Sequence, residues 1–175
     1  MNIVILNYLE NLKITSTDND KVSGSSWINV AQNNDKEKPS NRRGHTMIYH
    51  KGTLILYGGI GKDEKLVDDN IYRYTIETKT WNIVTLSGFK PGSRAFHTMN
   101  YFKSDSIIIF GGKTKQDNDL IANNDLIYID LNNWDCSTPF IANVGPSPRF
   151  GHSCSYNSNN NPDEHILLGG LDKTF

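Results

Sequence analysis

The chain has 175 residues, of which 37% are hydrophobic and 21% are charged, and its formal net charge at pH 7 is -1. It has no excess of basic groups to neutralise phosphates, so nucleic acid and anionic membranes are poor candidates as partners. Residues 1–12 are too short and too polar for a transmembrane span, and they lack the basic start and the cleavage site of a signal peptide. We therefore expect a soluble, cytoplasmic protein.

The N-terminal segment has the pattern of the second half of a small sheet. Residues 11–15 read as one strand, Trp27 marks the start of the next, and residues 3–6 are a candidate for a strand before both. Tryptophan then recurs at intervals of 54 and 53 residues, at Trp81 and Trp134. A fixed interval of this length indicates that one structural unit is repeated along the chain.

Three heptads follow, and each has the form Pro-x-x-Arg-x-x-His. They begin at Pro39, Pro91 and Pro146, so the repeat is 52 residues long in one case and 55 in the other. Each heptad precedes an apolar run that ends in paired glycines. A period of this length is typical of propeller blades and exceeds that of the shorter solenoid repeats.

Each heptad introduces the same series of predicted strands. A first and a second strand follow each heptad directly, and in the first two units a polar loop separates them from a third strand and from a fourth that opens with tryptophan. Four short strands per period predict a small antiparallel sheet. The expected strands are residues 46–49, 54–57 and 70–74 with the strand opening at Trp81, residues 98–101, 107–110 and 124–128 with the strand opening at Trp134, and residues 153–156 and 166–168.

The same phase divides the chain into four units. They are a partial first blade with its linker, two complete blades, and the first half of a further blade, at residues 1–38, 39–90, 91–145 and 146–175. The two complete units differ at one turn, because Tyr74 precedes Trp81 by seven residues whereas Ile129 precedes Trp134 by five. This difference predicts a turn two residues shorter in the second unit, with its tryptophan placed differently.

These motifs resemble the kelch repeat, which has an Arg-x-x-His lead, a diglycine after the second strand, an aromatic residue in the third and a spaced tryptophan in the fourth. The resemblance covers nearly the whole chain. It implies an all-β fold, an incomplete kelch-type β-propeller with about three four-stranded antiparallel blades where a closed ring has about four to eight. An open array leaves an apolar face and unpaired strand edges in water. We expect the remaining blades of a longer protein, or self-association, to cover them.

The recurring residues are interpreted as a structural framework. Glycine pairs can take positive φ and allow backbones to approach closely, whereas a phosphate-binding loop would need glycine in place of Leu56 and Ser or Thr in place of Asp63. We expect each imidazole to bond to its own blade and each arginine to donate to backbone carbonyls. The tryptophans could be ligand platforms, but their recurrence favours packing between sheets. The framework set is Trp27, Arg42, His45, Gly58, Gly59, Tyr74, Trp81, Arg94, His97, Gly111, Gly112, Trp134, Arg149, His152, Gly169 and Gly170.

No metal site is expected at the three histidines. Equivalent residues on stacked sheets are about 10 Å apart, whereas zinc holds its nitrogen ligands at about 2.0 to 2.1 Å. Cys136 and Cys154 lie in different units without metal-ligand spacing, and we expect them to be reduced, buried thiols.

The charged segments after the diglycines differ between copies, and we predict that they bind a protein partner. In kelch proteins these loops share one face of the propeller with the loops that join the fourth strand to the next blade, and this face commonly holds the partner site. Solvated loops that bind nothing are the alternative. The candidate partner-binding residues are Lys62, Asp63, Glu64, Lys65, Lys115, Asp117 and Asp119.

Catalysis is the competing hypothesis, because some kelch proteins are copper oxidases that resemble galactose oxidase and others are iron-dependent thiocyanate-pathway specifiers. The iron type uses Glu-x-x-x-Asp-x-x-x-His; here Glu64 and Asp68 match its first half, but Tyr72 stands at the histidine position. We therefore predict a protein-protein interaction module or scaffold without catalytic residues or cofactors. The alternative is the N-terminal kelch region of a larger enzyme, such as a kelch-containing protein phosphatase.

Overall fold

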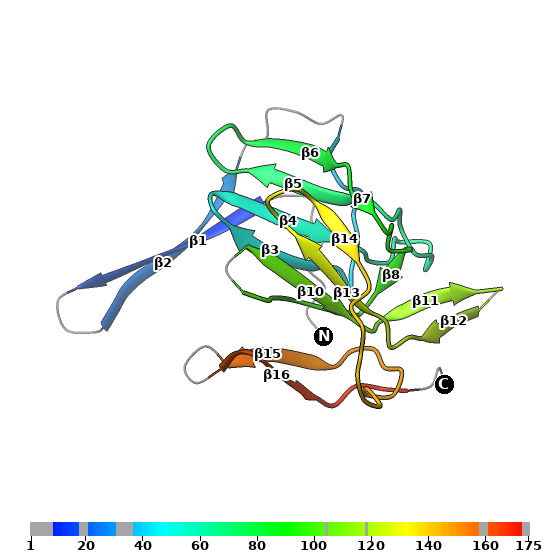
Figure 1. Ribbon diagram of the computed structural model, residues 1–175. Helices are drawn as coiled ribbons and strands as arrows, with labels where there is room; N and C mark the ends of the chain where they lie inside the picture. Colours follow the sequence, from blue (N-terminus) through cyan, green and yellow to red (C-terminus); the bar gives the residue numbers. More distant parts are fainter. Residues whose placement is uncertain are drawn as a thin grey trace.

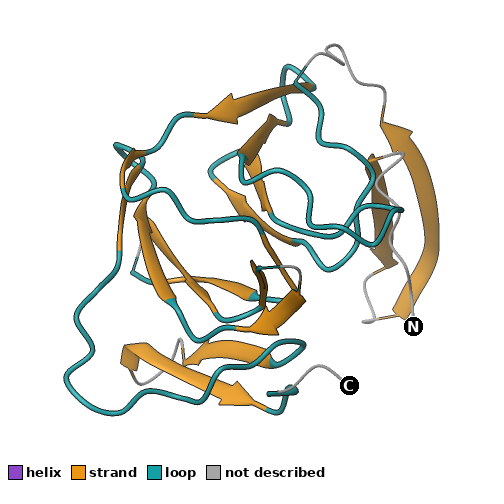
Figure 2. Ribbon diagram, turned by 90° about the vertical axis from the view of Figure 1, so that its right-hand side faces the viewer, coloured by secondary structure: helices purple, strands orange, loops and turns teal. Residues whose placement is uncertain are grey.

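Every regular element in the part of the chain that the structure describes is a β-strand (Figure 2). The structure is a computed structural model, and it describes residues 9–17, 21–30, 37–103, 105–117, 119–157 and 161–172. None of these residues belongs to a helix that could cross a membrane. The strands form separate sheets that follow one another in an arc (Figure 2).

The first complete sheet has the four strands that its heptad predicts. They pair antiparallel in chain order, so the sheet reads β3 (Thr46–His50), β4 (Thr53–Tyr57), β5 (Ile71–Thr75) and β6 (Thr80–Val84). Side chains alternate between the two faces of a strand, and β4 is apolar on both because both of its faces are covered. Ile55 and Tyr57 are buried on one side and Leu56 on the other.

The second complete sheet has the same core of four antiparallel strands. These are β9 (Thr98–Tyr101), β10 (Ser106–Phe110), β13 (Leu126–Asp130) and β14 (Asp135–Ser137). A fifth strand, β7 (Ser87–Gly88), pairs in parallel with β14 at the outer edge. It comes from the segment that connects the first complete sheet to the second.

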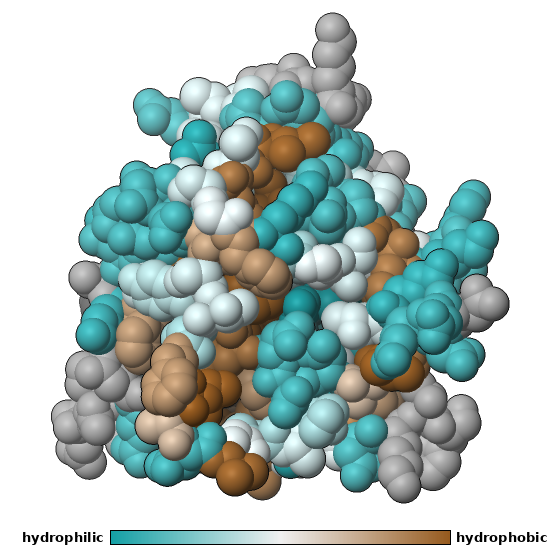
Figure 3. All heavy atoms as spheres, turned by 45° about the vertical axis from the view of Figure 1, so that its right-hand side comes forward, coloured by the Kyte–Doolittle hydropathy of each residue, from teal (hydrophilic) through white to brown (hydrophobic). Residues whose placement is uncertain are grey.

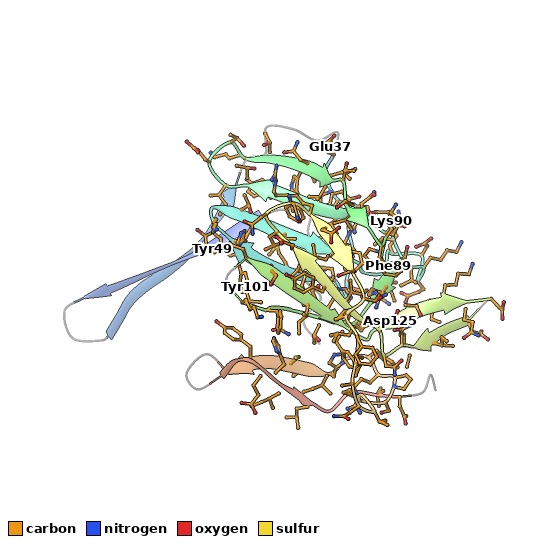
Figure 4. All side chains as sticks on the ribbon, viewed as in Figure 1. Glu37, Tyr49, Phe89, Lys90, Tyr101 and Asp125 are labelled. Atoms are coloured by element: carbon orange, nitrogen blue, oxygen red, sulfur yellow. The ribbon has the colours of Figure 1, made fainter. Side chains whose placement is uncertain are left out.

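This connector covers the outer edge of the second sheet. Ser87 donates its N–H to Trp134 O at 3.0 Å, and Phe89 donates to Cys136 O at 2.8 Å; Figure 4 labels Phe89. Gly88 has a φ of 74°, and a Cβ there would lie 2.5 Å from Cys136 O, so the pairing requires glycine. The connector thus removes an exposed strand edge of the kind that otherwise promotes aggregation.

The charged segment after the second diglycine is a β-hairpin, where the sequence led us to expect a loop that binds a partner. β11 (Lys113–Gln116) pairs with β12 (Asp119–Ala122), and β11 also pairs with β8 (Arg94–Ala95) of the heptad. The hairpin projects from the body of the molecule (Figure 1). Polar residues alternate poorly with apolar ones here, so the periodicity of the sequence did not reveal the strands.

Two further sheets have two strands each. β1 (Leu9–Thr17) pairs with β2 (Lys21–Val30), and β15 (Ser153–Asn157) pairs with β16 (Asn161–Leu168). The strand predicted at residues 11–15 lies within β1, while the one predicted at residues 3–6 falls outside the described residues. Trp27 lies inside β2, opposite Leu12, and does not open the strand.

The main core lies between the two complete sheets. The first sheet contributes Ile55, Tyr57 and Ile71. The second sheet contributes non-aromatic apolar side chains, namely Met99, Ile107, Ile109, Ile127, Ile129 and Cys136. A second cluster occupies the opposite face of the first sheet and consists of Leu56, Tyr72, Tyr74 and Trp81. Apolar side chains also reach the surface through the middle of the face shown in Figure 3.

The two tryptophans of the complete sheets are not equivalent. Trp81 lies in β6 opposite Tyr74, whereas the residue in that register of the second sheet is Cys136, opposite Ile129. Both turns between the third and fourth strands have four residues, 76–79 and 131–134. The prediction of a shorter turn is therefore wrong. Trp134 sits in the turn with a φ of 59°, as Lys79 does at 56°.

Candidate functional site

The heptad arginines anchor the glycine pairs of their own repeats. Each donates from Nη1 to the carbonyl of the first glycine of the pair, at 3.3 Å for Arg42 to Gly58, 3.1 Å for Arg94 to Gly111 and 2.9 Å for Arg149 to Gly169. The expectation that these arginines donate to backbone carbonyls is confirmed. Each of these bonds holds the end of the second strand against the heptad that precedes the first strand of the same repeat.

Two of these arginines are also buried ion-pair partners. Arg42 Nη2 lies 3.0 Å from Asp68 Oδ2, and Arg94 Nη2 lies 3.2 Å from Asp125 Oδ2. Figure 4 labels Asp125, which comes directly before β13. Both carboxylates are partly exposed, so each pair joins a buried guanidinium to the solvent-facing loop before the third strand.

The histidines connect neighbouring sheets. His97 Nε2 lies 2.6 Å from Thr46 Oγ1, and His152 Nε2 lies 2.9 Å from Thr98 Oγ1. The expectation that each imidazole bonds within its own blade is wrong, because the hydroxyl belongs to the preceding repeat. Among the described residues, no three His, Cys, Asp or Glu side chains are grouped so that they could hold a metal ion.

Burial keeps these imidazoles neutral. It lowers the pKa of His97 to about 3, and the charges of Arg94, His45 and His152 act in the same direction. Burial is also the largest cause of the lowered pKa of His152, followed by the charge of Arg149. A neutral imidazole can still bond to the threonine hydroxyl, so the contact between sheets does not need the proton.

The glycine pairs complete the same contact. Both glycines of every pair have positive φ, with values of 71° and 118° at Gly58 and Gly59. A Cβ on Gly58 would lie 2.3 Å from Arg94 O of the next repeat, and one on Gly111 would lie 2.6 Å from Arg149 O. Gly59 donates its N–H to Arg94 O at 2.8 Å, and Gly112 donates to Arg149 O at the same distance. Glycine is needed because the next repeat occupies the space of a side chain.

The two charged segments flank one groove. It has a volume of about 390 Å³ and lies between the loop after β4 and the hairpin β11–β12, with Ser93 of the heptad also lining it. Lys115 on β11 is opposite Leu120 on β12, so both side chains share the face of the hairpin that lines the groove. The groove residues are Glu64, Lys65, Leu66, Ser93, Lys115 and Leu120.

Only three of the seven predicted partner-binding residues line this groove. Glu64, Lys65 and Lys115 do, while Lys62, Asp63, Asp117 and Asp119 are exposed outside it. Asp117 lies at the turn of the hairpin with a φ of 53°, and Asp63 accepts the N–H of Lys65 at 3.4 Å. Sequence reasoning missed Leu66, Ser93 and Leu120; the signal was a single leucine within each charged segment.

The groove has exposed positive charge and a small apolar component. Glu64 forms an ion pair with Arg43, which neutralises the acidic residue that lines the groove. Lys65 and Lys115 bring ammonium groups to it, and Leu66 and Leu120 are half-buried. Such a surface favours a ligand that combines carboxylates with an apolar side chain.

The residues that match part of the iron motif are occupied elsewhere. Glu64 pairs with Arg43 and Asp68 pairs with Arg42. The Arg42 guanidinium also lies over the ring of Tyr72, at 5.0 Å from its centroid.

Both cysteines are free thiols, and burial raises the pKa of Cys136 to about 11, which makes it a poor nucleophile. Cys154 is only half-buried, in contrast to the expectation of a buried thiol.

The antiparallel sheets follow one another in an arc, and recurring contacts of Arg, His and Gly-Gly join neighbouring sheets. These features define a β-propeller-type repeat protein. A model of the KLHDC2/KLHL20/DRC7 Kelch-repeats domain matches residues 44–174. The chain therefore belongs to the kelch-repeat family, as its heptads and glycine pairs predicted.

Three curated relatives illustrate the range of proteins that contain such repeats. "Dynein regulatory complex subunit 7" of Chlamydomonas reinhardtii is 27% identical over 109 residues, which are 62% of this chain and 9% of that protein. "Tip elongation aberrant protein 1" of Schizosaccharomyces pombe is 29% identical over 145 residues, 78% of this chain and 12% of that protein. "N-(sulfonatooxy)prop-2-enimidothioate sulfolyase" of Thlaspi arvense is 25% identical over 150 residues, 84% of this chain and 40% of that protein. The chain thus spans less than half the length of each of these relatives.

A solved structure supports the fold. "Structure of YjhT" matches with a TM-score of 0.59 and 17% identity, over 78% of this chain and 36% of that one. At this identity the similarity concerns the fold alone, and it agrees with an all-β propeller-type arrangement.

Proposed function

We propose that this chain is a protein-interaction module whose partner site is the groove between the loop after β4 and the hairpin β11–β12. The observation that carries the proposal is the convergence of the two variable charged segments on one groove, outside the repeating framework. Membership of the kelch-repeat family supports a protein-binding role. A cytoplasmic location is part of this proposal, and the two unpaired thiols agree with it.

The framework explains why specificity belongs in these segments. Arg42, Arg94 and the glycine pairs are fixed by contacts that every repeat must make, so a change there affects stability first. The groove residues make few such contacts, and surface substitutions usually change stability by no more than about 0.5 kcal/mol. Partner recognition can therefore vary there without loss of the fold.

The chemistry of the groove suggests what the partner presents. An acidic, extended protein segment with one apolar side chain could place carboxylates near Lys65 and Lys115 and its apolar group between Leu66 and Leu120. Ammonium groups at such a rim raise association rates and fix the register of a partner more than they add raw affinity.

Capture of proteins from a lysate of the source cells, with quantitative mass spectrometry, tests the proposal. The paired variant Lys65→Glu with Lys115→Glu should lose the partner that wild type retains. The matched control is Lys79→Glu with Lys103→Glu, which reverses the same charges in the turns at the other end of the sheets. Equal loss in both variants, or retention in both, would contradict the proposed site.

A further inference from the structure

An ion pair at the edge of the groove joins the first heptad to the loop after β4. Arg43, in the heptad, pairs with Glu64, which lines the groove. The Arg43 guanidinium also donates from Nη1 to Gly61 O at 3.5 Å. A guanidinium has more N–H groups than these two contacts use, so Arg43 can bind a further acceptor. The pair therefore places a cation with spare donors directly beside a residue of the groove.

The side chain of Arg43 is not part of the repeating framework. Its position in the heptad is Ala95 in the second copy and Phe150 in the third. All three positions pair through the backbone with the residue that follows the glycine pair of the same repeat, namely Ile60, Lys113 and Leu171. Because this contact uses only the main chain, it does not select a side chain. The guanidinium is therefore a feature of the first repeat alone.

The loop holds Glu64 in a conformation that costs energy. Its φ is 61°, in the left-handed region that glycine adopts freely and glutamate adopts rarely. The turn is closed by main-chain bonds, from Gly61 N–H to Lys65 O at 2.9 Å and from Glu64 N–H to Gly61 O at 3.2 Å. Glycine could make the same turn with less strain, so what glutamate adds at this position is its carboxylate. Residues held in such conformations are concentrated at functional sites.

We infer, building on the proposed function, that Glu64 occupies the place on Arg43 of a carboxylate of the partner, and that binding exchanges one carboxylate for the other. The two groups are chemically alike, and arginine holds carboxylates in a bidentate geometry that lysine lacks. The Glu64 side chain is 70% exposed and that of Arg43 is 26% exposed, so release of Glu64 into water costs little and the guanidinium stays at the groove. Arg43 then becomes a third basic contact beside Lys65 and Lys115.

This exchange makes Glu64 a determinant of specificity. Because its carboxylate is tethered to the chain, it competes at an effective concentration of about millimolar. A ligand with one carboxylate therefore gains little at Arg43. A segment whose carboxylates meet both Arg43 and Lys115, on the two sides of the groove, displaces Glu64 because it binds at two points. We expect the partner segment to carry at least two acidic residues around its apolar side chain.

Fluorescence anisotropy of a labelled synthetic peptide, Glu-Leu-Glu-Glu-Leu-Glu, titrated with the full chain measures the exchange. Glu64→Gln should bind this peptide roughly three- to fivefold more tightly than wild type, which corresponds to the loss of one exposed ion pair. The matched control Asp63→Asn removes the same charge from the same turn, outside the groove, and should change the affinity far less. In an Arg43→Gln background, Glu64→Gln should give no gain, because no guanidinium remains for the carboxylate to block.

The paired variant Lys65→Glu with Lys115→Glu separates this inference from the proposed function, because it should abolish peptide binding in either case. Equal affinity of wild type and Glu64→Gln, with binding lost in the paired variant, would overturn the exchange and leave the groove as the site. A gain that Asp63→Asn matches, or that persists without Arg43, would also overturn the exchange, since general charge repulsion would explain it. Peptide binding that the paired variant retains, or no binding by wild type and Glu64→Gln, would refute the acidic-ligand site and the exchange together.

Discussion

Protonation of His97 should make the stability of the fold depend on pH in a predictable direction. The imidazole is 4% exposed, bonds to Thr46 of the preceding repeat and packs edge-on against Tyr57 with the ring centroids 5.2 Å apart. Its pKa is about 3 in the folded chain, against 6.5 for an ordinary histidine. The unfolded chain therefore binds a proton at a higher pH than the folded chain does.

The sign and size of the effect follow from this difference. Stability is fully present above pH 6.5 and is lost as the pH falls from 6.5 towards 3, because protonation in that range favours the unfolded chain. The loss is about 1.4 kcal/mol per pH unit, so that between pH 7.5 and pH 5 this one histidine removes about 2 kcal/mol from the free energy of unfolding.

Urea unfolding at pH 7.5 and pH 5 measures this loss. The variant His97→Gln keeps a side-chain donor for Thr46 but cannot be protonated, so its free energy of unfolding should fall by about 2 kcal/mol less than that of wild type over the same interval. Equal pH dependence of the two proteins would refute the reasoning and show that His97 is not neutral and buried in the folded chain.

Other substitutions test the contacts around this histidine. Gly58→Ala and Gly111→Ala should each destabilise the chain severely or abolish soluble expression, since their Cβ atoms would lie 2.3 and 2.6 Å from backbone oxygens, whereas Gly52→Ala, with a φ of 78° and open space around it, should cost only about 1 to 2 kcal/mol; similar melting temperatures for all three would contradict this. Trp81→Ala should lower the free energy of unfolding by roughly 3 to 5 kcal/mol because the side chain is 1% exposed. Trp134→Ala should lower it less, because Trp134 is half-buried; an equal shift of the urea midpoint in both variants would contradict this difference. Gly88→Ala should loosen the connector from β14, raising amide exchange at Phe89 without broad unfolding, and unchanged exchange would show that the pairing tolerates a side chain.

Much of the framework could be predicted because repetition supplies information that a single copy lacks. Three heptads in phase fixed the start of each first strand, and the glycine pairs fixed the end of each second strand at Tyr57, Phe110 and Leu168. Contacts between neighbouring repeats were harder to predict. That His97 bonds to Thr46 of the preceding repeat depends on how the sheets stack, which the order of residues along one repeat does not state.

The features that the sequence did not reveal depend on pairing between distant segments. β7 exists because Ser87–Gly88 meets β14, nearly 50 residues further along, and β11 is held by β8 of the heptad. Trp134 has the expected spacing from Trp81 but lies in a turn, and Cys136 is the residue of β14 that occupies the register of Trp81 in β6. In the groove, charge alone pointed to Glu64, Lys65 and Lys115, while Leu66 and Leu120 are found only when the two segments are seen to face each other.

Lysine-directed cross-linking of the captured complex, read by mass spectrometry, tests the proposed partner site most directly. The chain has lysines at both ends of its sheets, with Lys65 and Lys115 lining the groove and Lys51, Lys79 and Lys103 in the turns at the opposite end. We expect links to the partner from Lys65 and Lys115. Links confined to Lys51, Lys79 and Lys103 would contradict the site and place the partner at the other end of the sheets.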